Sequence, residues 1–225
     1  MGQWAGQVWI GRDWWGFEGA SGDSRPHAHL CAQVVAGLDG VARVETEAGV
    51  VEASVVVIPP GVRHRLLATD GLLRAIYPRP LGRLARRWRI AGDVAARPEW
   101  TNLLAAGDLA AALDAEAVLG EEQPIDERLR LALDDLDGDL SLADLAERAG
   151  LSSARLRALA QSELGAPLAH WRLWRRLEIA VLCLRAGESL ASAAAEAGFA
   201  DQSHLNRAMS RFFGITPRTV ARLLA

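Results

Sequence analysis

Three histidines in two short segments near the start of the chain could form a metal site. The segment PHAHLCAQV carries His27 and His29, and the segment IPPGVRH ends at His64. Alternate residues of a β-strand share one face, so an extended first segment would place both its histidines beside Gln33. The proline and glycine before His64 would form a tight turn that returns this side chain to the same place.

The chemistry of this set has two interpretations that the sequence leaves open. Three neutral imidazoles and the amide oxygen of Gln33 would suit a divalent transition metal such as Zn²⁺, Ni²⁺, Cu²⁺ or Fe²⁺. Cys31, on the same face, would then add a soft ligand or act as a reactive thiol. Alternatively the histidines are hydrogen-bonded walls of a pocket for an organic effector, lined also by Cys31, Trp9 and Trp14. Aromatic residues at such spacing more often belong to a hydrophobic core.

A second chemical pattern lies in the segment QSHLNRAMSRFF. Apolar residues recur at three- and four-residue spacing, which predicts a helix that buries one stripe. The other face presents Gln202, Ser203, Asn206 and Arg207. Amide, hydroxyl and guanidinium groups read base edges in the major groove of DNA. The pattern therefore predicts a recognition helix.

An internal repeat supports this prediction. SLADLAERAGL at 141–151 matches SLASAAAEAGF at 189–199, with a constant offset of 48 residues. Each copy opens with a serine suited to a helix N-cap and ends at a glycine that permits a left-handed turn. A second helix is expected after each turn, which makes two helix-turn-helix units.

The segment between the two copies predicts a helix that separates them. It runs from Pro167 to Gly187, residues that suit a helix start and end. About 18–20 residues at about 1.5 Å each span nearly 30 Å. One turn of B-DNA is about 34 Å, so such a rod would hold two recognition helices in successive major grooves.

Composition and spacing divide the chain into three parts. Short runs separated by glycines predict an all-β domain at 1–80, a helical linker at 81–121, and an all-α domain at 122–225. The sequence EEQP at 121–124 suits a hinge. Leu103, Leu109 and Leu113 form an apolar stripe that would contact a second copy of the chain or pack on its own domain.

The overall composition indicates a globular protein. Half of the 225 residues are hydrophobic and the net charge is −3, yet residues 151–225 contain ten arginines against five acids. The two cysteines are too few for a disulfide framework. We find no apolar run of the roughly 18 residues that cross a bilayer and no pattern of a signal peptide. A cytoplasmic location is therefore expected.

Residues 125–218 resemble the DNA-binding domain of AraC/XylS-family transcriptional regulators. The second half of the signature is close, with AGF at 197–199, Gln202-Ser203, Gly214 and Thr216-Pro217. The resemblance implies that a second recognition helix reads DNA through Gln202, Ser203, Asn206 and Arg207. The first would use Arg155 and Arg157, although Ala158 stands where the family usually has arginine. Phosphate contacts would come from Arg172, Arg175, Arg176, Arg211 and Arg218.

The histidine segments resemble the two cupin motifs. His-x-His-x-x-x-Gln covers residues 27–33 and Pro-x-Gly-x-x-His covers 59–64, with Gln33 where the family has a metal-binding glutamate. The resemblance implies a small cupin-like β-barrel that senses a metal ion or a small molecule, with His27, His29, His64 and Gln33 as metal ligands.

Together these patterns predict an α+β multidomain protein that acts as a bacterial-type transcription regulator and not as an enzyme. Its partners would be double-stranded DNA, the effector and a second copy of the chain, with no membrane. A metal-dependent cupin dioxygenase or isomerase fused to a DNA-binding domain is the main alternative, which the missing carboxylate ligand disfavours. Two further alternatives are a repair protein with a reactive cysteine and a regulator whose barrel is blind to effectors.

Overall fold

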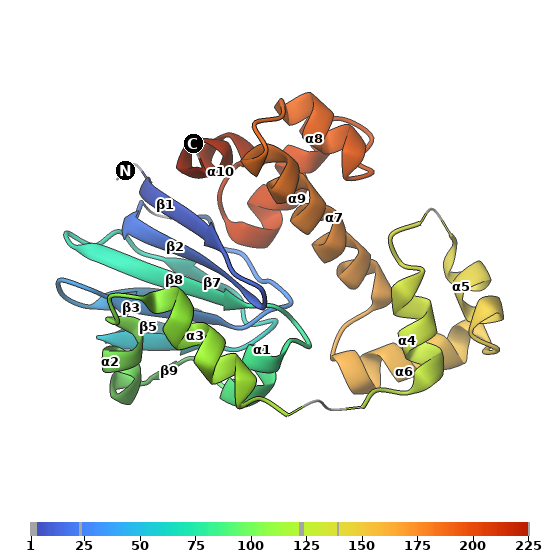
Figure 1. Cartoon of the computed structure of the whole chain (residues 1–225), viewed down its shortest axis with the longest axis horizontal. Helices are drawn as coiled ribbons and strands as arrows, with labels where there is room; N and C mark the ends of the chain where they lie inside the picture. Colours follow the sequence, from blue (N-terminus) through green and yellow to red (C-terminus); the bar gives the residue numbers. More distant parts are fainter. Residues whose placement is uncertain (1–3, 23, 122–123, 139, 225) are drawn as a thin grey trace.

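The computed structural model describes residues 4–22, 24–121, 124–138 and 140–224. A β-sheet domain forms the N-terminal part and a helical domain forms the C-terminal part, which confirms the predicted fold class (Figure 1). Of the predicted hinge, residues 122–123 lie outside the described residues.

The β-domain is built from short strands, as the glycine spacing predicts. They are β1 (Ala5–Ile10), β2 (Trp14–Ala20), β3 (Gln33–Gly37), β4 (Ala42–Thr46), β5 (Gly49–Ala53), β6 (Val55–Ile58), β7 (His64–Leu66), β8 (Leu72–Pro78) and β9 (Ala95–Ala96). A six-stranded sheet has the order β1-β2-β8-β3-β6-β9, and a three-stranded sheet has the order β5-β4-β7. Within the described residues these are two separate sheets, not the single closed barrel that we expected.

Strand β6 shows how the larger sheet is covered on both faces. All four of its residues are buried, in place of the alternation of a half-exposed strand. Val56 and Ile58 pack in the core shared with the three-stranded sheet. Val55 and Val57 point the other way and pack under helices.

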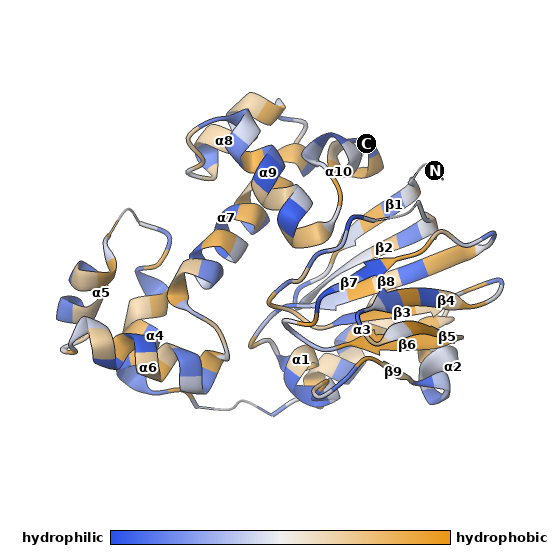
Figure 2. Ribbon diagram, turned by 180° about the vertical axis from the view of Figure 1, so that it is seen from behind, coloured by the Kyte–Doolittle hydropathy of each residue, from blue (hydrophilic) through white to orange (hydrophobic). Residues whose placement is uncertain are grey.

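Those helices come from the segment predicted as a linker. It forms α1 (Arg83–Trp88), the short strand β9, a 3-10 turn (Pro98–Trp100), α2 (Thr101–Leu104) and α3 (Leu109–Val118). Figure 1 shows α3 lying across one face of the larger sheet, and Figure 2 shows the sheet from its other side. Strand β9 pairs with β6. Leu109 and Leu113 are buried in this core and Leu103 packs against it, so the predicted stripe packs on its own domain and is not free for a dimer contact.

The helical domain consists of seven helices in the described residues. They are α4 (Glu127–Asp134), α5 (Leu142–Arg148), α6 (Ser153–Leu164), α7 (Leu168–Arg185), α8 (Leu190–Glu196), α9 (Gln202–Phe213) and α10 (Pro217–Leu224). α5–α6 and α8–α9 are the two helix-turn-helix units. Ser141 and Ser189 cap α5 and α8, accepting backbone N–H bonds at 3.2 and 3.1 Å. Gly150 and Gly198 have left-handed backbones with φ of 65° and 71°. The local prediction from the repeat is therefore confirmed.

Helix α7 joins the two units. Its 18 residues run between them, in agreement with the predicted rod (Figure 1). Among the described residues, no helix is both long and apolar enough to cross a bilayer.

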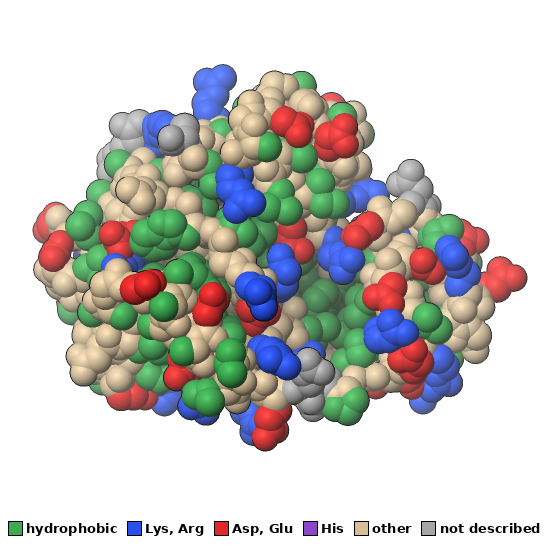
Figure 3. All heavy atoms as spheres, viewed as in Figure 1, with side chains coloured by type: hydrophobic (Ala, Val, Ile, Leu, Met, Phe, Trp, Pro, Cys, Tyr) green, Lys and Arg blue, Asp and Glu red, His purple; other side chains and the backbone are tan. Residues whose placement is uncertain are grey.

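The two units sit differently against the β-domain. The second unit shares a core with it, because Trp15 and Cys31 pack with Trp174 and Phe212. The first unit has a core of its own, against which Leu30 and Leu81 pack. A groove of about 520 Å³ lies beside it, lined by residues of α4, α7 and the 79–82 loop. Figure 3 shows this hollow, with hydrophobic side chains at its floor and arginines at its rim.

Candidate functional site

The three predicted histidines come together at one end of the β-domain. His27 pairs with His64, the first residue of β7, through two backbone hydrogen bonds of 2.8 and 2.9 Å. Gly61, with φ of 78°, donates its N–H to the carbonyl of His29 at 2.9 Å, so the predicted turn does return the second segment. The predicted extended strand through His27 and His29 is wrong, because β3 begins only at Gln33 and residues 28–32 are irregular.

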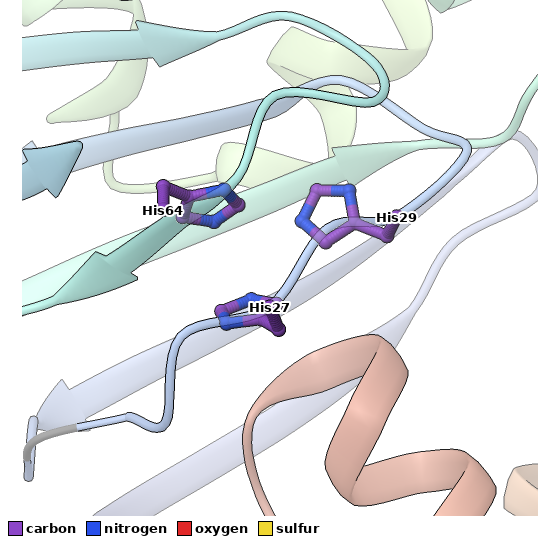
Figure 4. A group of neighbouring side chains, drawn as sticks. All are labelled: His27, His29 and His64. Atoms are coloured by element: carbon purple, nitrogen blue, oxygen red, sulfur yellow. The ribbon is translucent and has the colours of Figure 1, made fainter. Parts of the chain in front are cut away.

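The imidazoles form one compact cluster. The rings of His27, His29 and His64 turn toward a common centre in Figure 4. Each offers a ring nitrogen within 4.8 Å of the others, and each residue is only 2–3% exposed. The cluster is thus sealed from bulk water.

Backbone carbonyls fix the orientation and tautomer of each ring. The Nδ1 atoms of His27, His29 and His64 lie 2.8, 2.7 and 2.9 Å from the carbonyl oxygens of Arg25, Cys31 and Val62. A carbonyl only accepts, so each neutral ring donates from Nδ1 and keeps a lone pair at Nε2. This is the arrangement by which second-shell groups orient histidine ligands toward a metal.

Gln33 faces two of these lone pairs. Its Oε1 lies 2.9 Å from Nε2 of His64 and 3.3 Å from Nε2 of His29, while its Nε2 lies 2.8 Å from the hydroxyl of Tyr77. An oxygen facing two lone pairs is satisfied only if a cation lies among them. The alternative is an amide turned by 180°, which donates to both imidazoles and accepts from Tyr77. The donor set fits a divalent cation in the first arrangement.

Burial keeps the imidazoles neutral. Desolvation, with a smaller repulsion from neighbouring histidines, lowers the pKa of His27 to about 2 and that of His29 to about 4. Burial lowers the pKa of His64 as well. Neutral imidazole is the form that binds metals, so no proton has to leave at neutral pH.

Cys31 lies beside the cluster but away from its Nε2 atoms, and the two predicted tryptophans lie elsewhere. The sulfur of Cys31 is 3.4 Å from Nδ1 of His29, on the ring edge away from Nε2, and burial raises the pKa of this thiol. Cys31 is therefore a core residue and not a ligand. Trp14 is buried on the opposite face of the sheet, where its indole donates to Asp114 at 3.2 Å, and Trp9 packs there too. Neither tryptophan lines a pocket at the histidines.

Contacts across the domain seam were missed by sequence reasoning. The N–H of Arg25 donates to the carbonyl of Gly214 at 3.2 Å, next to the end of α9. The ring of Phe213 lies 6.4 Å from that of His29 and 6.1 Å from that of Tyr77. The histidine cluster thus adjoins the C-terminal end of a predicted recognition helix. No local pattern signals this contact, because its partners are almost 190 residues apart.

The two predicted recognition helices can be superposed residue by residue. α6 and α9 have the same length, and each ends at a left-handed glycine, Gly165 or Gly214. The offset is 49 residues here, so Ala158 corresponds to Arg207 and Ala154 to Ser203. All four are exposed.

The outward faces of these helices differ in chemistry. On α9, Ser203 and Arg207 are four residues apart and share a face opposite the buried Leu205 and Met209, with Asn206 also exposed. On α6, the corresponding face presents the methyl groups of Ala154 and Ala158. The predicted Arg155 and Arg157 are exposed but flank the buried Leu156 on opposite sides. Gln202, in the first turn of α9, is exposed as well.

The predicted phosphate contacts also divide into two groups. Arg172 donates to the carbonyls of Leu136 and Leu140 at 3.1 and 2.6 Å, which ties α7 to the loop before α5. Arg175 makes a bidentate pair with Asp137 at 2.8 Å. Both arginines stabilise contacts within the helical domain, and we therefore no longer expect Arg172 to contact DNA. Arg211 and Arg218 are exposed.

Comparisons with known proteins agree with this architecture. Residues 145–222 match a family described as a helix-turn-helix domain. No curated protein matches the chain in sequence. The match confirms the predicted resemblance to AraC-type regulators for the helical domain.

Solved structures extend the similarity to the whole fold. ToxT from Vibrio cholerae strain SCE256, with a bound unsaturated fatty acid, has a TM-score of 0.59 at 11% identity, covering 95% of each chain. ToxT from strain O395, bound to (E)-4-(8-methylnaphthalen-1-yl)but-3-enoic acid, has a TM-score of 0.60 at 12% identity over 95% of this chain and 100% of its own. An AraC-type regulator from Chromobacterium violaceum is 26% identical over 44% of this chain and 92% of its own, with a TM-score of 0.41. At 11–12% identity, the ToxT similarity shows a shared two-domain fold.

Proposed function

We propose that this chain, which carries an AraC-type helix-turn-helix domain, is a sequence-specific transcription regulator that acts on DNA in the cytoplasm. The main support for this proposal is the polar outward face of α9 near one end of α7, with a second helix-turn-helix unit at the other end. Ser203, Asn206 and Arg207 read bases, and Gln202 supports them from the first turn. Arg155, Arg157 and Arg211 contact the backbone or the edges of the site.

Binding of enriched DNA tests this proposal. DNA is selected from a random-sequence pool with the full chain, and its Kd is compared with that of a scrambled duplex at about 0.15 M salt. We expect a ratio of about 10³ or more, the usual margin of specific over non-specific binding. A ratio near one would contradict sequence-specific binding.

The histidine cluster is the proposed binding site for the effector of this regulator. We infer that His27, His29 and His64, with Gln33 as a fourth ligand, hold a divalent transition metal. The support is the compact cluster of three imidazoles oriented by backbone carbonyls, in which the Nε2 lone pairs of His29 and His64 face the amide oxygen of Gln33. Bound there, a cation would join residues 27–33, which include the irregular stretch 28–32, to β7. It would rigidify the surface on which the end of α9 rests. No residue is assigned a catalytic role.

Metal content tests the input directly. Protein is purified without chelator and without nickel affinity resin, beside His29→Ala and the exposed-histidine control His170→Ala, with circular dichroism to check folding. We expect near-stoichiometric metal in the wild type and in the control, and its loss in His29→Ala. Absence of metal in every folded protein, even after Zn²⁺, Ni²⁺, Cu²⁺ and Fe²⁺ are supplied, would refute the metal site.

The chain is also proposed to respond to an organic effector and to pair with a second copy of itself. Both ToxT structures hold organic molecules, and a small-molecule effector is the second candidate input for this chain. Pairing of two copies would match repeated half-sites on DNA, through a surface other than the buried Leu109 and Leu113. Light scattering with and without operator DNA would measure this pairing.

A further inference from the structure

The outward face of α6 is apolar, although this helix occupies the place of a recognition helix. α6 lies within residues 145–222, which match a helix-turn-helix domain, and it corresponds to α9 residue by residue. Ala154 and Ala158 are exposed and four residues apart, so their methyl groups project side by side. α9 has Ser203 and Arg207 at the same positions. α6 therefore offers methyl groups where α9 offers hydrogen-bonding groups.

Two polar side chains further along α6 bond to the backbone of their own unit. Nε2 of Gln161 donates to the carbonyl of Gly165 at 3.2 Å. The hydroxyl of Ser162 donates to the carbonyl of Leu159 at 3.0 Å. Because these donors are turned toward the protein backbone, the two alanine methyl groups dominate the chemistry that α6 presents outward.

Two arginines flank these methyl groups. At about 100° per residue, Arg155 and Arg157 lie about 80° to either side of the line through the two methyl groups. Both arginines are exposed, and Leu156 between them is buried on the opposite side. A helix with its side chains is about 10–12 Å across, and the major groove is about 12 Å wide. With the methyl groups on the groove floor, the two guanidinium groups would face the phosphates of the two walls.

An apolar helix face in the major groove selects an apolar base edge. Thymine presents a 5-methyl group there, whereas adenine, guanine and cytosine are distinguished by ring nitrogens, amino groups or a carbonyl oxygen. A methyl group placed over such polar atoms removes their water without replacing its hydrogen bonds, which costs free energy. Contact with a thymine methyl group instead removes apolar surface from water, and burial of one methyl group corresponds to about four-fold in affinity.

We propose that α6 recognises thymine through its 5-methyl group, with Ala154 and Ala158 as the contact residues. α9 recognises purines through hydrogen bonds, with guanine bound by Arg207. The inference rests on the proposed function, because it names the DNA chemistry that the same regulator reads. The operator is then asymmetric, with a thymine half-site under α6 and a purine half-site under α9 about 10 base pairs away. The thymine preference is the weaker of the two, since a methyl contact contributes less than a bidentate guanidinium pair.

Two base analogues test the proposal by fluorescence anisotropy on the DNA that the full chain selects. The half-site whose base preference survives Arg207→Ala is the one under α6. Uracil lacks only the 5-methyl group of thymine, and in the α6 half-site it should weaken binding about four-fold for each methyl group contacted. Uracil in the spacer between the half-sites should leave the affinity unchanged. Equal affinity for thymine and uracil in the α6 half-site would overturn the proposal.

The second analogue, 7-deazaguanine, lacks the N7 acceptor to which an arginine donates. It should weaken binding in the α9 half-site and have no effect in the α6 half-site. A loss of affinity in the α6 half-site with 7-deazaguanine would mean that α6 reads bases through hydrogen bonds, which would also overturn the proposal.

A pair of serine substitutions locates the methyl contact on α6. The double variant Ala154→Ser with Ala158→Ser replaces both methyl groups by hydroxymethyl groups. The control is Ala111→Ser with Ala115→Ser, an exposed pair with the same spacing on α3 of the β-domain. The ratio of affinities for thymine and uracil DNA should fall to near one in the α6 variant and stay unchanged in the control. An unchanged ratio in an α6 variant that circular dichroism shows to be folded would refute the assignment.

The same titrations separate this inference from the proposed function. They include a scrambled duplex, and equal affinity for operator and scrambled DNA would refute sequence-specific binding and the thymine contact together. A large preference for the operator with equal binding of its thymine and uracil forms would refute the thymine contact alone.

Discussion

The first and second helix-turn-helix units have the same fold but differ in what they present and in what they touch. α9 offers Ser203 and Arg207 outward, whereas α6 offers Ala154 and Ala158 at the corresponding positions. The second unit shares a core with Trp15 and Cys31 of the β-domain, whereas the first unit has a core of its own, beside a groove between α4, α7 and the 79–82 loop. Under the proposed function, base reading and the response to the effector would both be concentrated in the second unit.

The glycines that end the two recognition helices differ in how closely other atoms pack against them. Gly165 and Gly214 have nearly equal φ of 68° and 71°. A Cβ added at Gly165 would meet nothing within 4 Å, but one added at Gly214 would lie 2.7 Å from Nδ1 of His27 and 2.8 Å from the carbonyl oxygen of Arg25. The same backbone turn thus has open space around it in the first unit, whereas in the second unit it packs tightly against His27 and Arg25.

The largest expected effect comes from this glycine pair. Gly165→Ala should lower the free energy of unfolding by about 1–2 kcal/mol, the cost of a left-handed alanine. Gly214→Ala should lose a further 1–3 kcal/mol or so, because the methyl group has to displace backbone. Urea denaturation of both variants measures the difference. Equal losses would mean that the seam is not closed at Gly214.

Removing the outward arginine of α9 should have the next largest effect. Arg207→Ala should weaken operator binding by about 1–3 kcal/mol and relax base preference at one position. The control, Arg43→Ala, removes an arginine of β4 that pairs with Glu52 and should leave the affinity unchanged. Fluorescence anisotropy on operator and scrambled DNA gives both quantities. An equal loss on both DNAs would make Arg207 a phosphate contact.

Restoring an arginine to the first unit should have the opposite sign. Ala158→Arg places a guanidinium where α9 has Arg207, and it should strengthen DNA binding by about 1 kcal/mol through a charged hydrogen bond. The same anisotropy titration, repeated at several salt concentrations, should show a steeper salt dependence. Unchanged affinity and slope would mean that the outward face of α6 does not reach DNA.

The smallest expected effect separates the two kinds of arginine. Arg211→Ala should reduce the slope of log affinity against log salt by about 0.9, with little change in unfolding free energy. Arg172→Ala should instead destabilise the fold by about 1 kcal/mol, because it leaves the two loop carbonyls at 136 and 140 without their donor. A slope change in Arg172→Ala and none in Arg211→Ala would reverse these assignments.

Local chemistry was predictable from the sequence, and long-range chemistry was not. Ser141 and Ser189 cap helices because a cap depends on residues within one turn. The histidines gather as the spacing predicts, although through an irregular segment and a bridge, not a strand. The sequence could not assign Trp14 and Trp15 to a face of the sheet. Neighbouring residues of a strand point to opposite faces, but this rule does not say which of the two side chains packs against the helices.

Burial of the linker helices and the contact of Gly214 with Arg25 depend on tertiary packing between distant segments. The stripe of Leu109 and Leu113 fits a dimer contact and an intramolecular core equally well until the sheet beneath it is known. Likewise, the pairing of Arg172 with loop carbonyls is invisible in a sequence that shows only a basic helix.

We expect α9 to read bases and α6 to add little sequence specificity. The most direct measurement is selection from a random DNA pool by the full chain and by Arg207→Ala, with base preference scored at every position. We predict two half-sites about 10 base pairs apart. Strong preference should occur in only one of them, and Arg207→Ala should erase part of it. Equal preference in both half-sites, or an identical profile for Arg207→Ala, would contradict the claim.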